Sequence, residues 1–255
     1  MELRKNELLE WLGIDNTLSV QQIADHFSIS LPSARRLCTA LSDEGRLLRT
    51  HGGVRNLAAQ QATYSFEKFS QEYSGEKERI AKYASTLVKS HQVIFVESGT
   101  TLRQFSMALA ERIRREELHH IAIITNSLVN LEILHPVNTV VMLGGQYRAE
   151  RRDFIGYISE LSLRGLKLDY CFIGADAISL SDGVMAMDVD TLRFDTEVIK
   201  HAAKTVVLAH SAKFEKHSLL SFMSTDQCAC IVTDSGLSPV IADQYRQKKI
   251  NLVTV

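Results

Sequence analysis

The sequence predicts an α/β protein with two domains, joined by a linker over residues 58–75. We expect a winged helix-turn-helix over residues 1–57, because three short helical patterns precede a Gly-Gly hairpin there. We expect a largely parallel α/β domain over residues 76–255, because apolar runs alternate with helical patterns. A length of 255 residues accommodates one small and one larger domain.

The composition is that of a folded protein with no membrane segment. The chain is 45% hydrophobic and 23% charged, and it has only 3 Pro, which argues against long disordered tracts. The N-terminal stretch MELRKNELLEWL lacks the apolar core of a signal peptide, and no apolar run approaches the ~18 residues of a membrane span. We therefore expect a cytoplasmic protein with no membrane partner.

The cysteines and histidines do not have the spacing of a metal site. The 4 cysteines lie in apolar runs without a CxxC or Cys/His pattern, which indicates reduced core thiols. A metal site built from His119, His120, His201, His210 and His217 is an alternative, but no pair of them has i, i+4 spacing with a suitable carboxylate. We expect neither a metal nor a cofactor.

Two helices open the chain. Leucines at helical spacing predict the first over residues 4–12, with Gly13 ending it. Ser19 and Gln22 have the spacing of a capping box, in which each side chain satisfies a free backbone N–H. This pair predicts the start of the second helix.

A third helix is predicted to begin after Ser30 and to end at Gly45, with Pro32 tolerated in its first turn. Its apolar residues recur at helical spacing and face the core. In a helix-turn-helix this element enters the major groove, where arginine pairs with guanine and hydroxyls bond bases or phosphates. The residues that this spacing leaves exposed for DNA are Ser33, Arg35, Arg36 and Thr39.

The next segment predicts a wing. Residues 46–55 are typical of two short strands around Gly52-Gly53. The stretch 35–55 has a net charge of +3, from five arginines against Asp43 and Glu44, although the whole chain has a net charge of −1. A small three-helix domain with solvated arginines is the alternative, and the coincidence of these signals favours DNA binding. The predicted contacts from the wing are Arg49, His51, Gly52 and Arg55.

These motifs resemble those of the DeoR family of bacterial regulators. The resemblance rests on the segments 30–36 (SLPSARR) and 48–54 (LRTHGGV). It implies that double-stranded operator DNA is a partner. Leu37 departs from the family pattern, which usually has an aspartate there, so the operator sequence stays open.

The segment 56–75 reads as a linker that becomes aromatic toward its end. It carries Tyr64, Phe66, Phe69 and Tyr73 with no clean period and no interleaved arginine. We expect this cluster to pack on the second domain or on another subunit rather than to stack on bases.

The second domain alternates strands and helices. A helix is predicted over residues 77–89 and another after Gly99. Apolar runs predict buried strands over 93–96, 121–124, 139–143, 169–173, 205–208, 229–232 and 252–255.

Small, hydroxylic or charged residues follow these strands. The carboxyl ends of parallel strands form the ligand crevice of an open α/β sheet, and helix N-termini there attract anions. The loop Ser98–Thr101 suits a phosphate, since Gly99 permits close approach and the hydroxyls add donors. A polyanion or sugar-phosphate site is therefore expected, with the candidate ligands Glu97, Ser98, Gly99, Thr100, Thr101, Thr125, Asn126, Gly144, Gly145, Asp176 and Lys213.

The second domain also resembles the sensor domains of the DeoR family. The matching positions are Lys77, 98–101, 125–127, 143–145, Gly156, 172–175, Ser211, 213–214 and 233–234. The resemblance implies a fold like ribose-5-phosphate isomerase and glucosamine-6-phosphate deaminase, a phosphorylated sugar as effector, and repression of carbohydrate-metabolism genes that the effector relieves. The departures from the family pattern, at Glu97, Asp195, His210 and Ala212, leave the identity of the sugar open.

Two further alternatives concern function. An isomerase or deaminase of sugar phosphates needs an acid and a base, for which the loops offer Asp176, Asp182, Asp188, Asp190 and Glu197. Such carboxylates more often bond a sugar or cap helices, so we expect no enzyme and assign no catalytic residue. A helix-turn-helix used for protein contacts is the other alternative.

A single recognition helix reads too few base pairs for specificity, which predicts a homodimer or homotetramer.

Overall fold

The computed structural model describes residues 2–15, 17–44, 46–50, 52–55 and 64–255. The chain divides into two compact units, Met1–Ser65 and Phe66–Val255. Residues 66–75, which we assigned to the linker, lie in the larger unit and include helix α5 (Phe66–Gln71).

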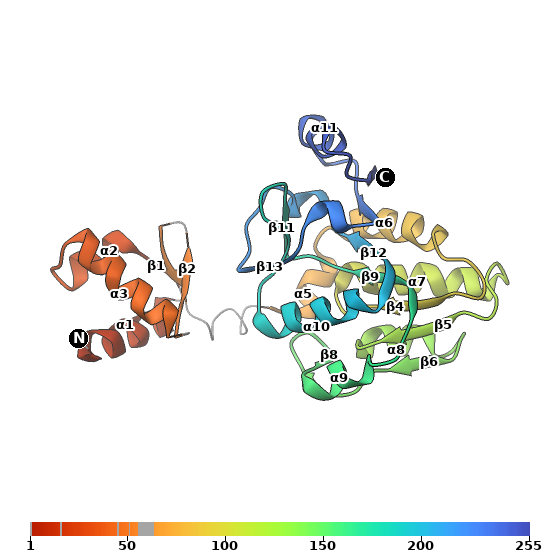
Figure 1. Cartoon of the computed structure of the whole chain (residues 1–255), viewed down its shortest axis with the longest axis horizontal. Coiled ribbons are helices and arrows are strands. Elements are labelled where there is room, and N and C mark those ends of the chain that lie inside the picture. Colours follow the sequence, from red (N-terminus) through yellow and green to blue (C-terminus); the bar gives the residue numbers. More distant parts are fainter. Residues whose placement is uncertain (1, 16, 45, 51, 56–63) are drawn as a thin grey trace. The chain divides into compact units, whose positions relative to one another are not determined.

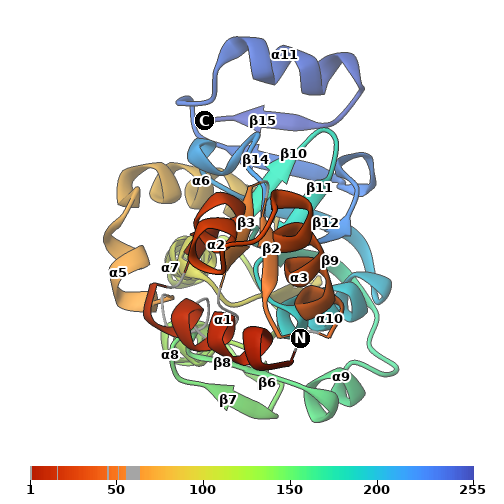
Figure 2. The ribbon, with the colours of Figure 1, turned by 90° about the vertical axis from the view of Figure 1, so that its left-hand side faces the viewer.

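In its described residues, the smaller unit combines three helices with a small antiparallel sheet (Figure 1). Figure 2 shows its helices with β2 beside α3 and β3 beside α2. The elements are α1 (Glu2–Asp15), β1 (Thr17–Ser19), α2 (Val20–His26), α3 (Leu31–Asp43), β2 (Leu48–Thr50) and β3 (Gly53–Arg55).

The predicted caps of this unit are present. Ser19 and Gln22 form a capping box at α2, and the Ser30 side chain caps α3. The prediction that Gly13 ends the first helix is wrong, because α1 continues to Asp15. Helix α3 ends at Asp43, and Gly45 lies outside the described residues.

Strand β1 was not predicted, and it makes the wing a three-stranded sheet in the order β1-β3-β2. Gly53 pairs with Ser19, and a Cβ at Gly53 would lie 2.1 Å from the carbonyl oxygen of Leu18. Only a glycine therefore lets β3 approach β1 this closely.

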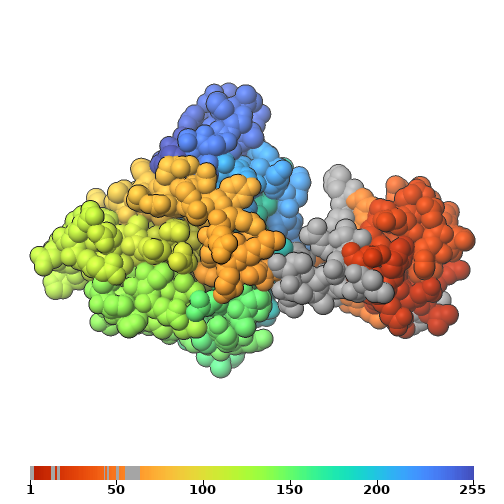
Figure 3. Space-filling view, turned by 180° about the vertical axis from the view of Figure 1, so that it is seen from behind, coloured from red at the N-terminus to blue at the C-terminus, as the bar shows by residue number. Residues whose placement is uncertain are grey.

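The larger unit is built on a seven-stranded sheet in the order β15-β14-β12-β9-β4-β5-β6. Every neighbouring pair is parallel, which confirms the predicted sheet. The strands are β4 (Val93–Val96), β5 (Ala122–Thr125), β6 (Val140–Met142), β9 (Leu168–Ile173), β12 (Ala202–Leu208), β14 (Cys230–Thr233) and β15 (Leu252–Thr254). In the space-filling view the blue C-terminal segment and the green segment of the middle of the chain lie at opposite ends of this unit (Figure 3).

Helices cover both faces of the sheet. Side chains alternate along each strand, so that Ile94 and Val96 belong to one core and Phe95 to the other. The first core is closed by α6 (Ser74–Thr86), α7 (Thr100–Arg114) and α8 (Leu128–Leu134). The second is closed by α10 (Val189–Lys200) and α11 (Pro239–Gln247). Within the described residues, no helix is long and apolar enough to cross a membrane.

Short elements inserted between the main strands complete the unit. Strands β7 (Gln146–Arg148) and β8 (Asp153–Ile155) form a hairpin, and β10 (Ala177–Ser179), β11 (Gly183–Ala186) and β13 (Leu220–Met223) form a small sheet. Their short apolar patterns gave no strand signal in the sequence. The remaining elements are α9 (Tyr157–Ser162) and the 3-10 turns η1 (Ser211–Lys213) and η2 (Thr225–Gln227).

Candidate DNA interface and effector site

Helix α3 presents its two adjacent arginines to solvent. Arg35 and Arg36 are both exposed, whereas Leu37 is buried, with only 5% of its surface exposed. Ser33 is half-buried at the N-terminus, where its hydroxyl lies 2.9 Å from that of Ser30 and 3.5 Å from the Arg36 guanidinium. The arginine pair is therefore available on this helix, and Ser33 takes part in the cap.

The wing is tied to α3 by one hydrogen bond. Arg49 of β2 donates to the Thr39 hydroxyl at 2.6 Å, and that hydroxyl donates to the Arg35 carbonyl oxygen at 2.9 Å. Gly52 is exposed in the turn between β2 and β3. His51 lies outside the described residues, and of Arg55 only the backbone in β3 is described.

The sheet register aligns the polar loops of the larger unit. Val96 is level with Thr125 on one side and with Phe172 on the other. Glu97, Asn126 and Gly174 therefore follow three adjacent strands at the same edge. The other predicted ligand residues follow β6, β9 and β12 at their carboxyl ends, so the fold gathers the predicted set at one edge (Figure 1).

The phosphate-type loop begins the long helix α7. Gly99 has φ +123°, a conformation that L side chains rarely adopt, and the first turn starts at Thr100. Ser98 is buried, and its hydroxyl donates to Asp153 at 2.8 Å. The free N–H groups of the first turn give this loop the donors that an anion requires.

Other predicted residues have structural partners. The Thr125 hydroxyl donates to the Val96 carbonyl oxygen at 2.6 Å and links two strands. The Asn126 side-chain amide donates to the Phe154 carbonyl oxygen at 3.1 Å. A Cβ at Gly145 would lie 2.2 Å from the Ser159 hydroxyl, so this glycine permits close packing of α9, while Gly144 is exposed and its carbonyl oxygen accepts from Ser159.

An arginine and carboxylate network lies beside this loop. The sequence pointed only to its members Asp176 and Asp188, and not to Arg148, Arg151 and Asp153. Arg148 binds Asp153 through two hydrogen bonds of 2.8 and 2.7 Å and Asp188 through one of 3.0 Å. Arg151 lies 3.1 Å from Asp188 and 3.8 Å from Asp176. Burial by itself would lower the pKa of Arg148, but the carboxylates of Asp153 and Asp188 raise it. The charged run 148–153 was the available signal, but it has no period that places it at the strand ends.

Two buried carboxyl groups face the same region. The Gly174 N–H donates to Glu97 at 2.6 Å, yet burial raises the pKa of Glu97 to about 8. Burial and the neighbouring Glu97 raise the pKa of Asp195 as well. Near neutral pH this pair therefore retains a proton in the protein without a ligand.

A cluster of basic groups lies near Lys213. Lys77 is buried and donates to the carbonyl oxygens of Phe69 and Glu72, the latter at 2.7 Å. Burial, with Lys213 adding to it, lowers the pKa of Lys77 to about 8. Burial and the two lysines lower the pKa of His210 to about 4, and its ring stacks on Tyr73 at 4.2 Å. Lys213 lies close enough to lower the pKa of Lys77, and two neighbouring lysines favour binding of an anion here.

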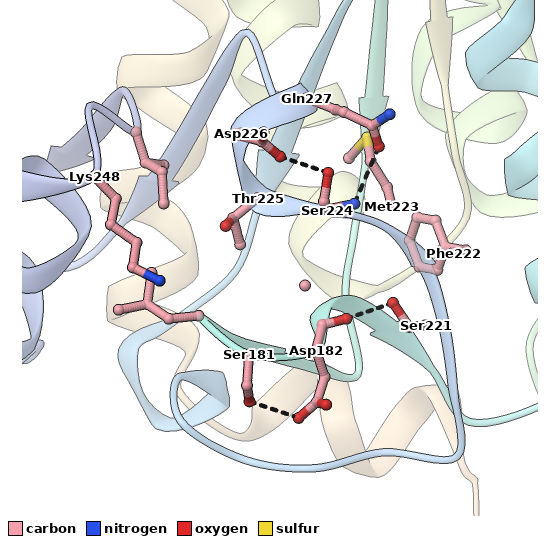
Figure 4. A pocket seen from close by; sticks show the side chains of 13 residues that line it. Ser181, Asp182, Ser221, Phe222, Met223, Ser224, Thr225, Asp226, Gln227 and Lys248 are labelled. Carbon is pink, nitrogen blue, oxygen red and sulfur yellow. Dashed lines mark hydrogen bonds between the residues drawn. The ribbon is translucent and has the colours of Figure 1, made fainter.

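A separate hollow of about 800 Å³ lies elsewhere in this unit (Figure 4). Residues 225–227, Lys248 and Ile250 line it and precede β14 and β15, so it lies toward the amino ends of the strands. Its polar side chains bond one another: Ser181 donates to Asp182 at 2.9 Å, and Ser224 forms a capping box with Gln227. These bonds stabilise turns, and we assign no ligand to this hollow.

A winged helix with exposed arginines, joined in one chain to an α/β unit with a polar site at its strand ends, defines a ligand-responsive DNA-binding regulator. Comparison with known proteins gives the family. Residues 4–60 match the DeoR-like helix-turn-helix domain, and residues 72–235 match the DeoR C terminal sensor domain. The chain belongs to the DeoR family of transcriptional regulators.

The similar proteins are regulators. The chain is 32% identical over 248 residues to the lactose phosphotransferase system repressor of Lactococcus lactis subsp. lactis, covering 96% of this chain and 95% of that protein. It is 26% identical over 247 residues to the HTH-type transcriptional regulator IolR of Bacillus subtilis (strain 168), covering 96% and 94%. These names agree with a regulator rather than an enzyme.

Among solved structures, ribose 5-phosphate isomerase A from Methanocaldococcus jannaschii matches with a TM-score of 0.41 and 24% identity. The match covers 54% of this chain and 53% of that chain, so it spans about half the length of the isomerase.

Proposed function

We propose that this protein is a cytoplasmic repressor of carbohydrate-metabolism genes that releases its operator when a phosphorylated sugar binds the larger unit. The proposal depends on one observation above all. The loop that starts α7 and the basic cluster around Lys213 follow strands of the same parallel sheet at its carboxyl edge. Such an edge binds anionic ligands in open α/β folds.

The DNA-binding half of the proposal rests on Arg35 and Arg36. Both side chains are exposed on a helix whose opposite face forms the core of the smaller unit. An arginine in the major groove recognises guanine through two hydrogen bonds. We infer that α3 reads the operator, and that Thr39, Arg49, Gly52 and the rest of the wing contact its backbone.

The second half of the proposal concerns how the larger unit binds the phosphate and the sugar of its effector. The phosphate binds Ser98, Gly99, Thr100, Thr101 and Lys213, and the sugar lies toward Glu97, Asn126 and Asp176. The relative named as a lactose phosphotransferase system repressor supports a sugar-related ligand. The ligand acts by binding the DNA-free arrangement of subunits more tightly than the DNA-bound one.

We further propose that the protein works as a homodimer or homotetramer. Repeated half-sites are needed because one recognition helix contacts too few base pairs for genomic specificity. Analytical ultracentrifugation of the full chain tests this, and a monomer at the concentration that saturates the operator would contradict it.

A gel-shift titration tests the whole proposal. The probe is the DNA upstream of the protein's own gene, and the titrants are sugar phosphates and the same sugars without phosphate. We expect a sequence-preferring shift that sugar phosphates reverse and free sugars do not. Replacing Arg35 and Arg36 together by alanine should weaken binding more than tenfold, since each arginine-base contact contributes roughly 1–3 kcal/mol.

The matched control replaces Arg114, the last residue of α7, and the following Arg115, both exposed, by alanine and should bind DNA normally. Unchanged affinity in the Arg35 and Arg36 variant would refute the assigned interface. A shift that no sugar phosphate affects would refute the assigned effector.

A further inference from the structure

The strand-end site has an excess of carboxyl groups around Glu97 and Asp195. These two lie on different elements, Glu97 after β4 and Asp195 on α10. Burial raises the pKa of both, and the nearby Glu97 raises that of Asp195 further. The other charged groups that act on the pair are two arginines and three carboxylates: Arg148, Arg151, Asp153, Asp176 and Asp188.

The arginines already have carboxylate partners. Arg148 binds Asp153 and Asp188, and Arg151 lies 3.1 Å from Asp188. Among the described residues, no ion pair joins a cation to Glu97 or Asp195. The pair thus consists of two buried acids, at 7% and 2% exposure, without a contacting counter-ion.

Two of the buried acceptors that lack a donor lie in this region, and a third, Asn130 Oδ1, belongs to the side chain that donates to the Glu97 carbonyl oxygen. Asp195 Oδ1 and Asn126 Oδ1 have no hydrogen-bond partner among the described residues. Asn126 is 1% exposed and follows β5, the neighbour of the strand that carries Glu97. Buried acceptors are almost always satisfied, so these two oxygens indicate a donor that comes from outside the chain.

We propose that the effector is a phosphorylated amino sugar, whose ammonium group lies between Glu97 and Asp195. This inference rests on the proposed function and names the class of its ligand. An ammonium group brings three hydrogen-bond donors and a full positive charge. No contacting side chain of the described residues supplies such a charge to the two acids. A hydroxyl in its place brings one donor and no charge.

The protonation of the pair gives this ligand a distinctive signature. Burial raises the pKa of both acids, and Glu97 adds to the rise at Asp195, so the pair holds a proton at pH 7. An arriving ammonium group must therefore lower both pKa values. Binding of the amino sugar should therefore release about one proton to the buffer. Binding of a sugar phosphate that has a hydroxyl in place of the amine should release none from this pair.

Calorimetry on the full-length protein tests the proposal with three matched pairs. The pairs are the 6-phosphates of glucosamine and glucose, of galactosamine and galactose, and of mannosamine and mannose. We expect the amine of at least one pair to bind at least about tenfold more tightly than its hydroxyl partner. Repeating that titration in buffers of different ionisation enthalpy should show the released proton.

In the variant Asp195→Asn, the affinities for the amino sugar phosphate and its hydroxyl partner should differ by no more than about twofold, and the hydroxyl sugar should still bind. Asp190→Asn, at an exposed position on the same helix, is the control and should keep the preference. If Asp195→Asn does not fold, Glu97→Gln serves the same purpose. An unchanged preference in the folded variant overturns the inference.

The two levels of the proposal fail differently. If hydroxyl sugars bind as tightly as amines in every pair, the amino-sugar inference is overturned and the sugar-phosphate function stands. If none of the six ligands binds, the sugar-phosphate function is overturned together with the inference.

Discussion

Arg49 of the wing donates a 2.6 Å hydrogen bond to the hydroxyl of Thr39 on α3. The same hydroxyl donates to the Arg35 carbonyl oxygen one turn earlier. Through Thr39, the wing and the helix that carries the arginine pair are held in one arrangement. A fixed arrangement reduces the entropy that is lost when both elements contact DNA.

We expect Thr39→Val to weaken operator binding by roughly 2- to 10-fold, because it removes a hydrogen bond that contributes about 0.5–1.5 kcal/mol to the arrangement. Fluorescence anisotropy with labelled operator measures the change. Thr86→Val, at an exposed position of α6, is the control. Equal affinity of the Thr39 variant and the wild type would show that the contact does not matter for DNA.

Gly53 and Gly52 should differ sharply in their tolerance of alanine. A Cβ at Gly53 would overlap the Leu18 carbonyl oxygen at 2.1 Å, whereas a Cβ at Gly52 has no atom within 4 Å. We expect Gly53→Ala to lower the free energy of unfolding of the smaller unit by about 1–3 kcal/mol or more, and Gly52→Ala to leave it within about 0.5 kcal/mol. Urea denaturation followed by Trp11 fluorescence distinguishes them, and similar midpoints would contradict the β1–β3 contact.

Arg148 should be a strong stability determinant of the larger unit. It forms a buried two-bond pair with Asp153, so Arg148→Ala leaves that carboxylate, 1% exposed, without its cation. We expect a loss of about 3–5 kcal/mol in the free energy of unfolding. Arg152→Ala removes only a more exposed ion pair with Glu132 and should cost less than about 1 kcal/mol. A similar small loss for both variants in chemical denaturation would show that the network is solvated.

His210 should make the larger unit sensitive to acid. Burial lowers its pKa from 6.5 to about 4, so the folded state holds it neutral. Its stabilising contribution is fully present above pH 6.5 and is lost as the pH falls toward 4, because the unfolded chain then binds the proton first. Allowing for solvent screening, the loss is on the order of 2 kcal/mol.

Thermal unfolding between pH 7 and pH 4 measures this dependence. The variant His210→Gln should lose less stability over that interval than the wild type. His217→Gln, at an exposed position, is the control and should follow the wild type. Identical pH profiles for wild type and His210→Gln would show that another group titrates there.

Local sequence patterns predicted the elements whose formation depends on local spacing. The capping box of Ser19 and Gln22, the cap at Ser30 and the parallel strands are all present, because caps and periodicities involve residues a few positions apart. The loop at Gly99 was also predicted, since a glycine between a buried strand and a helix marks the carboxyl edge of a sheet.

The tertiary structure alone decided which distant residues meet. Strand β1 joins the wing through a close approach to Gly53, and Ser98 meets Asp153 across 55 positions of sequence. The pairing of Glu97 with Asp195 likewise depends on how α10 packs on the sheet. Hydrophobic periodicity states which face of an element is buried, but not which neighbour covers it. The sequence by itself therefore determined the two-domain class of this protein and the edge of the sheet where its ligand is expected, and packing decided the charges that surround it.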